Sequence, residues 1–243
     1  MTPALDVPAK PAATVLLLRD SADGLEVFML RRTMSAAFAR GMYVFPGGKV
    51  DEADGEGDLG YLVAAIRECY EEAGVLLAHD SDGNMVFDGH PALAQRHAVH
   101  AGTIGLLQLC AEHGLTPATG DLAWVSHWIT PIGESDRRFD TRFFVAAAPH
   151  GQSSRHDDTE TIASEWVRPH DALRRAAERE LTMMPPTISN LEAIADYPTA
   201  ADAMSWARRQ QRPTAILPRL RRNAEGRLSG ISLPWDEDYA DLD

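Results

Sequence analysis

Three glutamates that share one face of a predicted helix are the residues best suited to chemistry in this chain. With about 100° of turn per residue, Glu68, Glu71 and Glu72 fall within one narrow arc if residues 62–77 are helical. Apolar side chains occupy the adjoining arc, so the helix can bury one stripe and present the acids along its edge. Like charges at this spacing repel one another. The pattern therefore predicts a cation site, because Mg²⁺ and similar ions prefer carboxylate oxygens and keep waters and substrate phosphates as further ligands.

The residues around the acids favour this interpretation over its alternative. A solvated acidic face is the usual explanation of a Glu-rich helix, but here a Pro-Gly-Gly turn at residues 46–48 precedes the acids. Gly74 follows them and is predicted to end the helix in a left-handed conformation. Arg67 lies one turn before Glu71 and is predicted to hold its carboxylate in place.

Residues 67–75 resemble the second half of the Nudix hydrolase signature at every fixed position, and Gly48 matches the first glycine of that signature. The spacing departs from the family pattern, because the eighteen residues between Gly48 and Arg67 form a longer interval than usual. The first glutamate of the signature therefore has two candidate counterparts, Asp54 and Glu56. The rest of this acidic stretch is predicted to be a solvated loop.

The resemblance implies a Nudix-like α/β/α sandwich with a mixed β-sheet, Mg²⁺ or Mn²⁺ as cofactor, and hydrolysis of a pyrophosphate bond. The implied metal ligands are one helix face and the backbone of the glycine turn, namely Glu68, Glu71, Glu72, Gly47 and Gly48. Arg67 is counted with the catalytic residues. The proton of the attacking water goes either to Glu68 or to a downstream glutamate, for which Glu160 is preferred to Glu165.

Further motifs resemble the branch of the Nudix family that includes a peroxisomal coenzyme A diphosphatase. They are residues 45–51, the lengthened loop, residues 137–144 and residues 185–187. This resemblance implies an anionic nucleotide-type substrate, with coenzyme A or acyl-coenzyme A first and ADP-ribose or a dinucleotide next. Arg32 belongs to a partial match to an extended coenzyme A motif, in which Ala37 replaces an arginine. A plain strand that leads into the metal loop explains the same residues equally well.

Arginines suggest where the phosphates of such a substrate bind. Arg137 and Arg138 stand beside an aromatic residue and are predicted to grip phosphate and a base, unless they only anchor their own loop. Six more arginines occur near the C-terminus with no acid between them: Arg208, Arg209, Arg212, Arg219, Arg221 and Arg222. They predict a site for a terminal phosphate, such as the 3′-phosphate of coenzyme A. The alternative is a solvated or dimer-pairing set.

Composition narrows the class of protein. The chain has 243 residues, 44% of them hydrophobic, and a net charge of −13, which argues against general binding of nucleic acid or of an anionic membrane. Cys69 and Cys110 are predicted to be core residues. The first ten residues lack the order of a signal peptide and no apolar run is long enough to span a membrane, so a cytoplasmic location is predicted.

The chain is predicted to divide into a flexible arm, a catalytic domain, a C-terminal appendage and an acidic tail, at residues 1–11, 12–180, 181–233 and 234–243. Residues 91–113 are predicted to be a helix inserted into the catalytic domain, and its histidines, His97, His100 and His113, to be ordinary helix residues rather than zinc ligands. The appendage is predicted to be two helices and a hairpin that serve as a lid or a homodimer contact. A nucleotide-sensing regulator of the same fold, with these helices on DNA, is the alternative to an enzyme.

Overall fold

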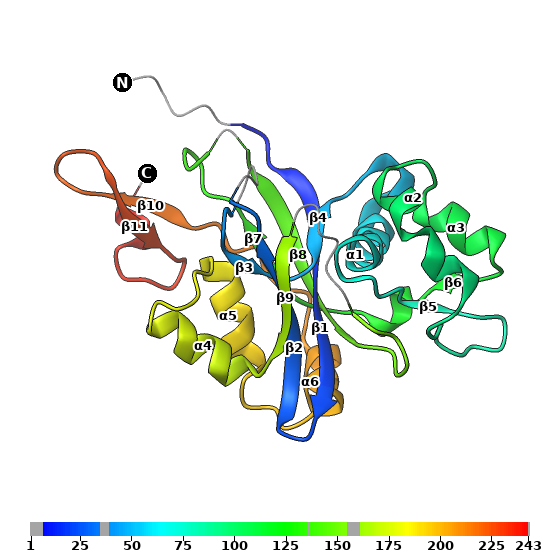
Figure 1. Cartoon of the computed structure of the whole chain (residues 1–243). Coiled ribbons are helices and arrows are strands. Elements are labelled where there is room, and N and C mark those ends of the chain that lie inside the picture. The colour runs from blue at the N-terminus through cyan, green and yellow to red at the C-terminus, as the bar shows by residue number, and fades with distance from the viewer. Residues whose placement is uncertain (1–6, 35–38, 136, 155–160, 243) are drawn as a thin grey trace.

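A mixed β-sheet lies between two layers of helices (Figure 1). The structure, a computed structural model, describes residues 7–34, 39–135, 137–154 and 161–242. The strands of the sheet are β1 Lys10–Ser21, β2 Gly24–Arg32, β3 Tyr43–Val44, β4 Gly47–Lys49, β7 Ala123–Ile129, β8 Phe139–Ala147 and β9 Thr161–Val167. The helices are α1 Gly57–Ala73, α2 Arg96–His100, α3 Leu106–Glu112, α4 Pro169–Ala177, α5 Pro185–Ile194 and α6 Ala200–Arg209. Two small two-stranded sheets pair β5 Ala78–His79 with β6 Thr116–Pro117 and β10 Arg219–Arg222 with β11 Leu228–Ser232.

Strand β1 is the centre of the main sheet. It pairs antiparallel with β2 and β4 and parallel with β8, within the order β3-β2-β1-β8-β7. Val15 and Leu17 belong to one hydrophobic cluster, whereas Leu16 and Leu18 belong to another, and all four are fully buried. Successive side chains of a strand point to opposite faces. The uninterrupted apolar run in the sequence is therefore explained by a sheet that is covered on both faces.

Helix α1 covers one face of the sheet and carries the predicted acids. Its apolar stripe includes Ile66, Cys69 and Tyr70, which are fully buried in the same cluster as Val15 and Leu17. The helix ends at Ala73, and Gly74 follows with φ 72°, so the predicted left-handed termination is confirmed. It begins earlier than predicted, at Gly57, and ends four residues before the predicted position 77.

Helices α4, α5 and α6 cover the opposite face (Figure 1). Leu191 and Ile194 of α5 and Ala203 of α6 are fully buried in the cluster that contains Leu16 and Leu18. The predicted C-terminal helical pair is therefore present and supplies part of the second layer of the sandwich. The hairpin of β10 and β11 projects from this body.

The inserted segment differs from its prediction. Residues 91–113 were expected to form a single helix, but they hold a 3₁₀ helix, Pro91–Gln95, followed by the short helices α2 and α3. The chain breaks between these helices at Gly102, whose φ of 67° is the left-handed region that favours glycine. Both cysteines are buried and unpaired, which confirms their predicted place in the core. None of the helices in the described residues combines the length and apolar composition needed to span a bilayer.

The packing of α5 predicts how the chain responds to core truncation. Replacing Leu191 with Ala should lower the free energy of unfolding by about 2–5 kcal/mol, because the side chain is fully buried against the sheet. The matched change Leu228→Ala, on the hairpin where the side chain is 55% exposed, should stay within about 0.5 kcal/mol. Urea unfolding of the two variants measures the difference. Equal effects would mean that α5 is not part of the core.

Candidate active site

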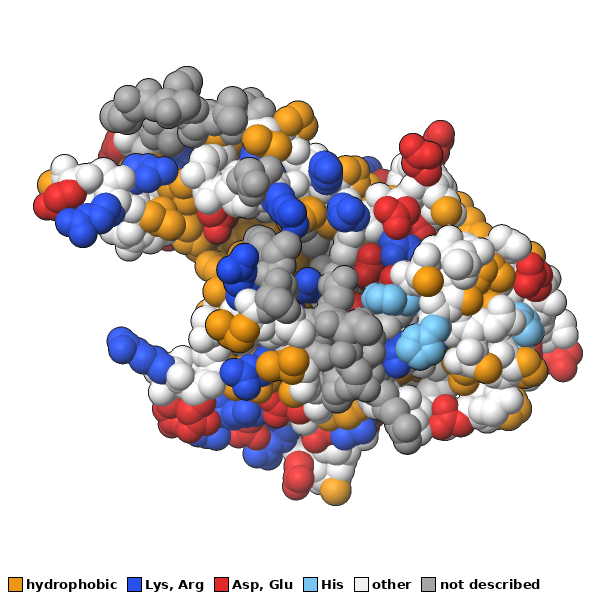
Figure 2. Space-filling view, turned by 45° about the horizontal axis from the view of Figure 1, so that its top comes forward, with side chains coloured by type: hydrophobic (Ala, Val, Ile, Leu, Met, Phe, Trp, Pro, Cys, Tyr) orange, Lys and Arg blue, Asp and Glu red, His pale blue; other side chains and the backbone are white. Residues whose placement is uncertain are grey.

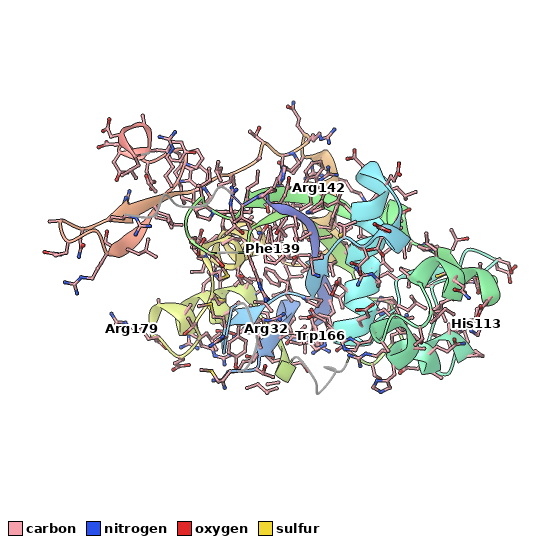
Figure 3. The ribbon with its side chains drawn as sticks, turned by 90° about the horizontal axis from the view of Figure 1, so that it is seen from above. Arg32, His113, Phe139, Arg142, Trp166 and Arg179 are labelled. Atoms are coloured by element: carbon pink, nitrogen blue, oxygen red, sulfur yellow. The ribbon has the colours of Figure 1, made fainter. Side chains whose placement is uncertain are left out.

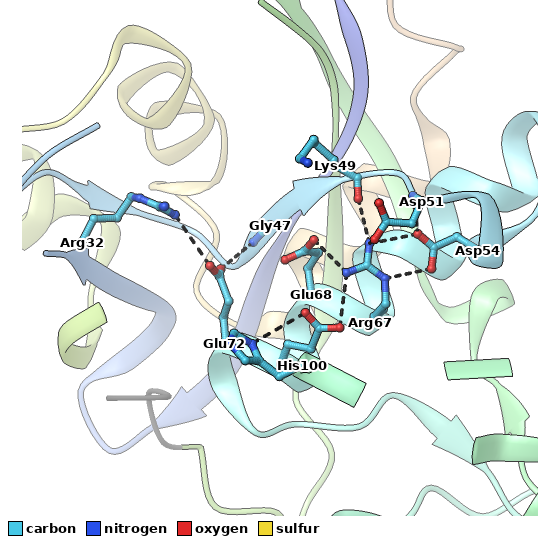
Figure 4. A network of polar contacts seen from close by, with 10 residues as sticks. Arg32, Gly47, Lys49, Asp51, Asp54, Arg67, Glu68, Glu72 and His100 are labelled. Atoms are coloured by element: carbon cyan, nitrogen blue, oxygen red, sulfur yellow. Dashed lines mark hydrogen bonds and ion pairs between the residues drawn. The ribbon is translucent and has the colours of Figure 1, made fainter. Parts of the chain in front are cut away.

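Helix α1 brings its three predicted acids to the glycine turn of β4. Glu71 and Glu72 are buried, and the side chain of Glu68 is 13% exposed. The Gly47 backbone N–H donates to Glu72 Oε2 at 2.9 Å (Figure 4). The structure thus places the acids of one element against the backbone of another that lies twenty residues away in sequence. This is the juxtaposition that the predicted cation site requires.

Arg67 is the centre of the ion-pair network beside these acids (Figure 4). Its guanidinium donates to both carboxylate oxygens of Asp54 at 2.9 Å, a bidentate contact. Nη1 donates to Glu68 Oε1 at 2.9 Å and to Glu71 Oε1 at 3.3 Å, and Nη2 donates to the Lys49 carbonyl at 2.7 Å. Arg67 therefore joins the acidic loop, β4 and α1 at one point, and the predicted contact with Glu71 is present.

Of the two candidates for the signature glutamate that the sequence left unassigned, Asp54 is the one that contacts Arg67. Its side chain is 1% exposed and paired with Arg67, whereas Glu56 is exposed immediately before α1 and its side chain makes no capping hydrogen bond. Asp54 also accepts a hydrogen bond from the Asp51 backbone at 2.8 Å. The neighbouring residues 51–53 and 55–58 are exposed, which agrees with the predicted solvated stretch.

The acids lie where their charged forms are unfavourable without more positive charge. Burial raises the pKa of Glu68 to about 7 and also raises the pKa of Glu71, although Arg67 partly offsets both effects. Burial alone would lower the pKa of Arg67, but its hydrogen bonds with Asp54 and its charged neighbours raise it. Arg67 is therefore always a cation. The buried carboxylates therefore lack enough neighbouring positive charge, which a bound divalent cation would supply.

The two glycines of the turn have no side chain, and neighbouring atoms occupy the space that a side chain would fill. A Cβ atom on Gly48 would overlap the carboxylate of Glu68, and one on Gly47 would overlap Thr14 and the Ala13 carbonyl of the adjacent strand. Gly48 and Gly47 are paired in register with Ala13 and Thr14. The close approach of the two strands therefore requires glycine at position 47, whereas a side chain at position 48 would displace the Glu68 carboxylate.

The donor set fits a hard divalent cation in kind, since it consists of carboxylate oxygens and the backbone of the glycine turn. As the side chains stand in the described residues, no three acidic, histidine or cysteine groups are gathered closely enough to hold a metal ion. The reason is visible in the network: Arg67 Nη1 binds Glu68 and Glu71, while Glu72 is held by Gly47. Binding a cation would draw Glu68 and Glu71 away from Arg67.

The inserted helix α2 adds two residues that the sequence did not indicate for this site. Arg96 Nε donates to the Glu71 backbone carbonyl at 2.9 Å, and His100 Nδ1 lies 3.9 Å from Glu71 Oε2. The prediction that His100 is an ordinary helix residue therefore missed its position. No local spacing could have revealed it, because the contact depends on how the insertion packs against α1.

Arg32 ends β2 beside the acids, with Nη1 3.7 Å from Glu72 Oε1. The other predicted phosphate ligands have different surroundings. Arg138 is buried and donates to the carbonyls of Thr130 and Val7, whereas Arg137 is exposed. Arg32 is thus the predicted substrate-binding arginine that the structure places next to the carboxylates.

The six C-terminal arginines are not gathered at one site. Arg219 Nη1 binds the Tyr239 carbonyl at 2.8 Å and its guanidinium covers the Tyr239 ring. Arg221 pairs with Asp238, and Arg212 pairs with Asp58 at the start of α1. The predicted site for a terminal phosphate is therefore not formed by this set as a cluster, because its members bind different parts of the chain.

Two downstream glutamates were predicted as alternative proton acceptors, and the structure describes one of them. Glu165 on β9 is paired with Arg175 of α4 at 2.8 Å, so its carboxylate belongs to a contact between the sheet and a helix. Glu160, the preferred downstream base, lies outside the described residues. Its assignment stays a prediction.

A cavity of about 190 Å³ adjoins the acids. Gly47 and Arg32 form part of its wall, which links it to the site of Glu72. Figure 2 shows a hollow at the middle of this face, with Lys and Arg side chains around it and Asp, Glu and His side chains on its right-hand side. In Figure 3, Arg32 and Phe139, both in the cavity wall, lie near the middle of the molecule, whereas His113 and Arg179 lie at its two ends.

Comparisons with known proteins agree with this arrangement. A family model described as the NUDT19 Nudix domain matches residues 55–194, and a model described as the NUDIX domain matches residues 8–100. The human acyl-coenzyme A diphosphatase NUDT19 is 24% identical over an alignment that covers 74% of this chain and 63% of the human protein. The chain thus spans less than two thirds of the length of that relative.

Two further similarities concern a shorter stretch and a solved structure. The peroxisomal coenzyme A diphosphatase ndx-8 of Caenorhabditis elegans is 33% identical over 39% of this chain and 40% of the worm protein. A crystal structure of a NUDIX hydrolase from Alicyclobacillus acidocaldarius superposes with a TM-score of 0.71 and 29% identity, covering 82% of this chain and 97% of the other. The predicted α/β/α sandwich with a mixed sheet is confirmed by this similarity together with the observed sheet.

The pairing of Arg67 predicts a large difference between two neighbouring acids. Asp54→Ala should lower the free energy of unfolding by about 3–5 kcal/mol, because it leaves a buried guanidinium without its bidentate partner. Glu56→Ala should change it by no more than about 0.5 kcal/mol. Denaturant unfolding of both variants in the absence of metal compares them. A larger loss for Glu56→Ala would assign the signature position to Glu56 instead.

The glycine turn predicts an effect on metal binding. Gly48→Ala should weaken Mn²⁺ binding at least about ten-fold, because the new methyl group displaces the Glu68 carboxylate. Gly120→Ala is the matched control, since a Cβ atom there meets nothing within 4 Å. Titration calorimetry, or the paramagnetic resonance of free Mn²⁺, measures both affinities. An unchanged affinity in Gly48→Ala would remove Glu68 from the metal site.

Proposed function

This chain belongs to the NUDT19 Nudix domain family, and on that premise we propose that it is a divalent-cation-dependent hydrolase of the pyrophosphate bond in nucleoside diphosphate-linked compounds. The observation that carries the proposal is the position of Glu68, Glu71 and Glu72 against the Gly47 turn, with Arg67 buried beside them. The family assignment by itself indicates the fold and does not distinguish an enzyme from a ligand-sensing protein. The retained acids and their support by Arg67 are what favour catalysis over ligand sensing.

In the proposed reaction, a water oxygen bonds to one phosphorus and the bridging oxygen leaves with the electron pair of its bond, so that two phosphate monoesters result. A bound divalent cation offsets phosphate charge and lowers the pKa of a coordinated water. Glu71 and Glu72 would hold this ion, Glu72 beside the Gly47 N–H that already binds it and Glu71 once its carboxylate has exchanged Arg67 for the cation. Glu68 is the proton acceptor that the described residues offer, because it is the least buried of the three.

A cationic side chain beside the acids would position the phosphates. Arg32 lies beside Glu72 and in the wall of the adjoining cavity. A guanidinium suits phosphate because its donors match two oxygens at once. This local positive charge would bring an anionic substrate to a chain whose net charge is −13.

Coenzyme A or acyl-coenzyme A is the proposed substrate, and Mg²⁺ or Mn²⁺ the proposed cation. Support comes from the described activities of the human and worm relatives, one an acyl-coenzyme A diphosphatase and the other a peroxisomal coenzyme A diphosphatase. ADP-ribose and dinucleotides are the next candidates. The cytoplasmic location and the homodimer remain predictions.

Removing one metal ligand should abolish most of the activity. Glu71→Gln should lower kcat/KM for coenzyme A with Mg²⁺ by more than about 100-fold. Changing a residue that only supports a metal ligand typically costs about 10–100-fold, and loss of a ligand itself should cost more. Glu112→Gln, an exposed position on α3 that pairs with Gln108, is the matched control and should retain full activity. Chromatographic separation of the two phosphate monoester products, with both variants checked for intact folding, measures the rates. Undiminished turnover by Glu71→Gln would contradict the proposed function.

The same assay extends to the choice of substrate. Coenzyme A, 3′-dephospho-coenzyme A, ADP-ribose and a dinucleoside polyphosphate are compared with the unaltered protein. Cleavage of ADP-ribose or of a dinucleotide in preference to coenzyme A would leave the hydrolase class intact and overturn the proposed substrate.

A further inference from the structure

The cavity beside Arg32 is built from segments that lie far apart in the sequence. Strands β7 and β8 contribute Trp128 and Phe143 and the turn between β3 and β4 contributes Phe45, all of which are buried in the core cluster under α5 and α6. The C-terminal segment contributes Met184, Pro185 and Ile231. The walls are mainly apolar and aromatic, and Gly47 connects them to the acids of α1. A substrate group that occupies this cavity is therefore one that is bonded directly next to the phosphates at the proposed site.

The wall favours a phosphate at the Arg32 edge of the cavity over one in its apolar interior. Among the described lining residues, the charged ones are Arg32, which is paired with Glu72, and Glu134, which is exposed. A phosphate group placed in the cavity would lose its hydration against apolar walls and meet the Glu134 carboxylate. Coenzyme A has one half of each kind: the adenosine half bears a 3′-phosphate, whereas the pantetheine half is neutral. The charge of the wall favours the neutral half.

One of the residues that line the cavity carries an unsatisfied donor. Trp128 is 3% exposed and its indole N–H has no hydrogen-bond partner. Buried polar groups are nearly always paired, so a lone donor in the wall of a cavity indicates a ligand that carries an acceptor. Trp128 lies opposite Thr141, another lining residue, in the register of β7 and β8. An amide carbonyl of the ligand would satisfy this N–H.

The volume limits how much of a substrate can enter. An apolar cavity of about 150 Å³ holds a molecule of the size of benzene, and complete ligand pockets usually measure about 300–1,000 Å³. At about 190 Å³, this cavity takes a compact fragment. The fragment next to the pyrophosphate in the pantetheine half is the pantoyl segment, a dimethyl-substituted carbon followed by a secondary alcohol and an amide carbonyl. It is neutral and compact, its dimethyl carbon is apolar, and its carbonyl is the acceptor.

Resting on the proposed function, we propose that the cavity between the sheet and the Met184–Pro185 segment binds the pantoyl segment of a coenzyme A-type substrate. The pyrophosphate then lies toward Arg32 and Gly47, and the nucleoside half lies outside the cavity. This cavity selects coenzyme A derivatives over ADP-ribose, because ADP-ribose places a polyhydroxylated sugar where the apolar segment belongs. The remainder of the pantetheine arm extends beyond the cavity, so that selection acts next to the phosphates.

Two half-substrates test the assignment by direct binding. The probes are 4′-phosphopantetheine and adenosine 3′,5′-bisphosphate, each titrated by calorimetry with Mg²⁺ present. Trp128→Phe removes the donor and should weaken 4′-phosphopantetheine binding about five-fold, the effect of losing one neutral hydrogen bond. Met184→Trp fills part of the cavity and should weaken it about ten-fold or more. Neither change should alter the affinity for adenosine 3′,5′-bisphosphate.

Trp166→Phe is the matched control, because this tryptophan lies on β9 outside the cavity wall and its N–H is already bound to Ser154 at 2.7 Å. It should change neither affinity. Thermal unfolding identifies any variant that fails to fold, and Met184→Ala, which enlarges the cavity, replaces Met184→Trp in that case with an expected loss of about two-fold or more.

The outcomes separate this inference from the proposed function. Weaker binding of adenosine 3′,5′-bisphosphate with unchanged 4′-phosphopantetheine would assign the cavity to the nucleoside half and overturn the inference. Unchanged binding of both probes in all cavity variants would also overturn it, while coenzyme A cleavage by the unaltered protein would leave the hydrolase intact. An unaltered protein that cleaves ADP-ribose but does not bind 4′-phosphopantetheine overturns the inference alone. A protein that cleaves no pyrophosphate overturns the proposed function and the inference with it.

Discussion

A buried guanidinium that must be neutralised on several sides is the constraint on which the proposed active site depends. Arg67 is 7% exposed and is in contact with Asp54, Glu68 and Glu71. A charge in this position is costly unless its donors are satisfied, so the surrounding elements are held where they can satisfy them. The acidic loop, the end of β4 and the face of α1 meet for this reason. The acids proposed to bind metal are therefore brought to one face of α1 beside the glycine turn, where Arg67 holds Glu68 and Glu71.

The same constraint explains how the chain absorbs its lengthened interval. Asp54 contacts Arg67, and α1 starts at Gly57, so the interval between them consists of a short turn followed by the first turns of α1. Asp58 in the first turn of α1 pairs with Arg142 and Arg212. The lengthened interval thus still allows Asp54 to reach Arg67.

Patterns that act within one element were predictable, and contacts between elements were not. The spacing of Glu68, Glu71 and Glu72 and the left-handed Gly74 follow from helix geometry, and the apolar run of β1 follows from burial on both faces. Counting along the chain could not choose between Asp54 and Glu56, because only the packing shows which one reaches Arg67. The contacts of His100 and the dispersal of the C-terminal arginines have the same origin.

The C-terminal segment connects stability to the proposed specificity. Helices α5 and α6 cover the face of the sheet that holds Leu16 and Leu18, and the chain just before α5 supplies Met184 to the cavity wall. The wall facing it comes from β7 and β8, whose strands are held in register across Trp128 and Thr141. A side chain at the start of α5 can therefore change the shape of the cavity while Arg67 and its carboxylates stay in place. Because the proposed cleavage depends on α1 and the proposed choice of neighbouring group depends on this later segment, the fold would allow selection among diphosphates to vary separately from the chemistry.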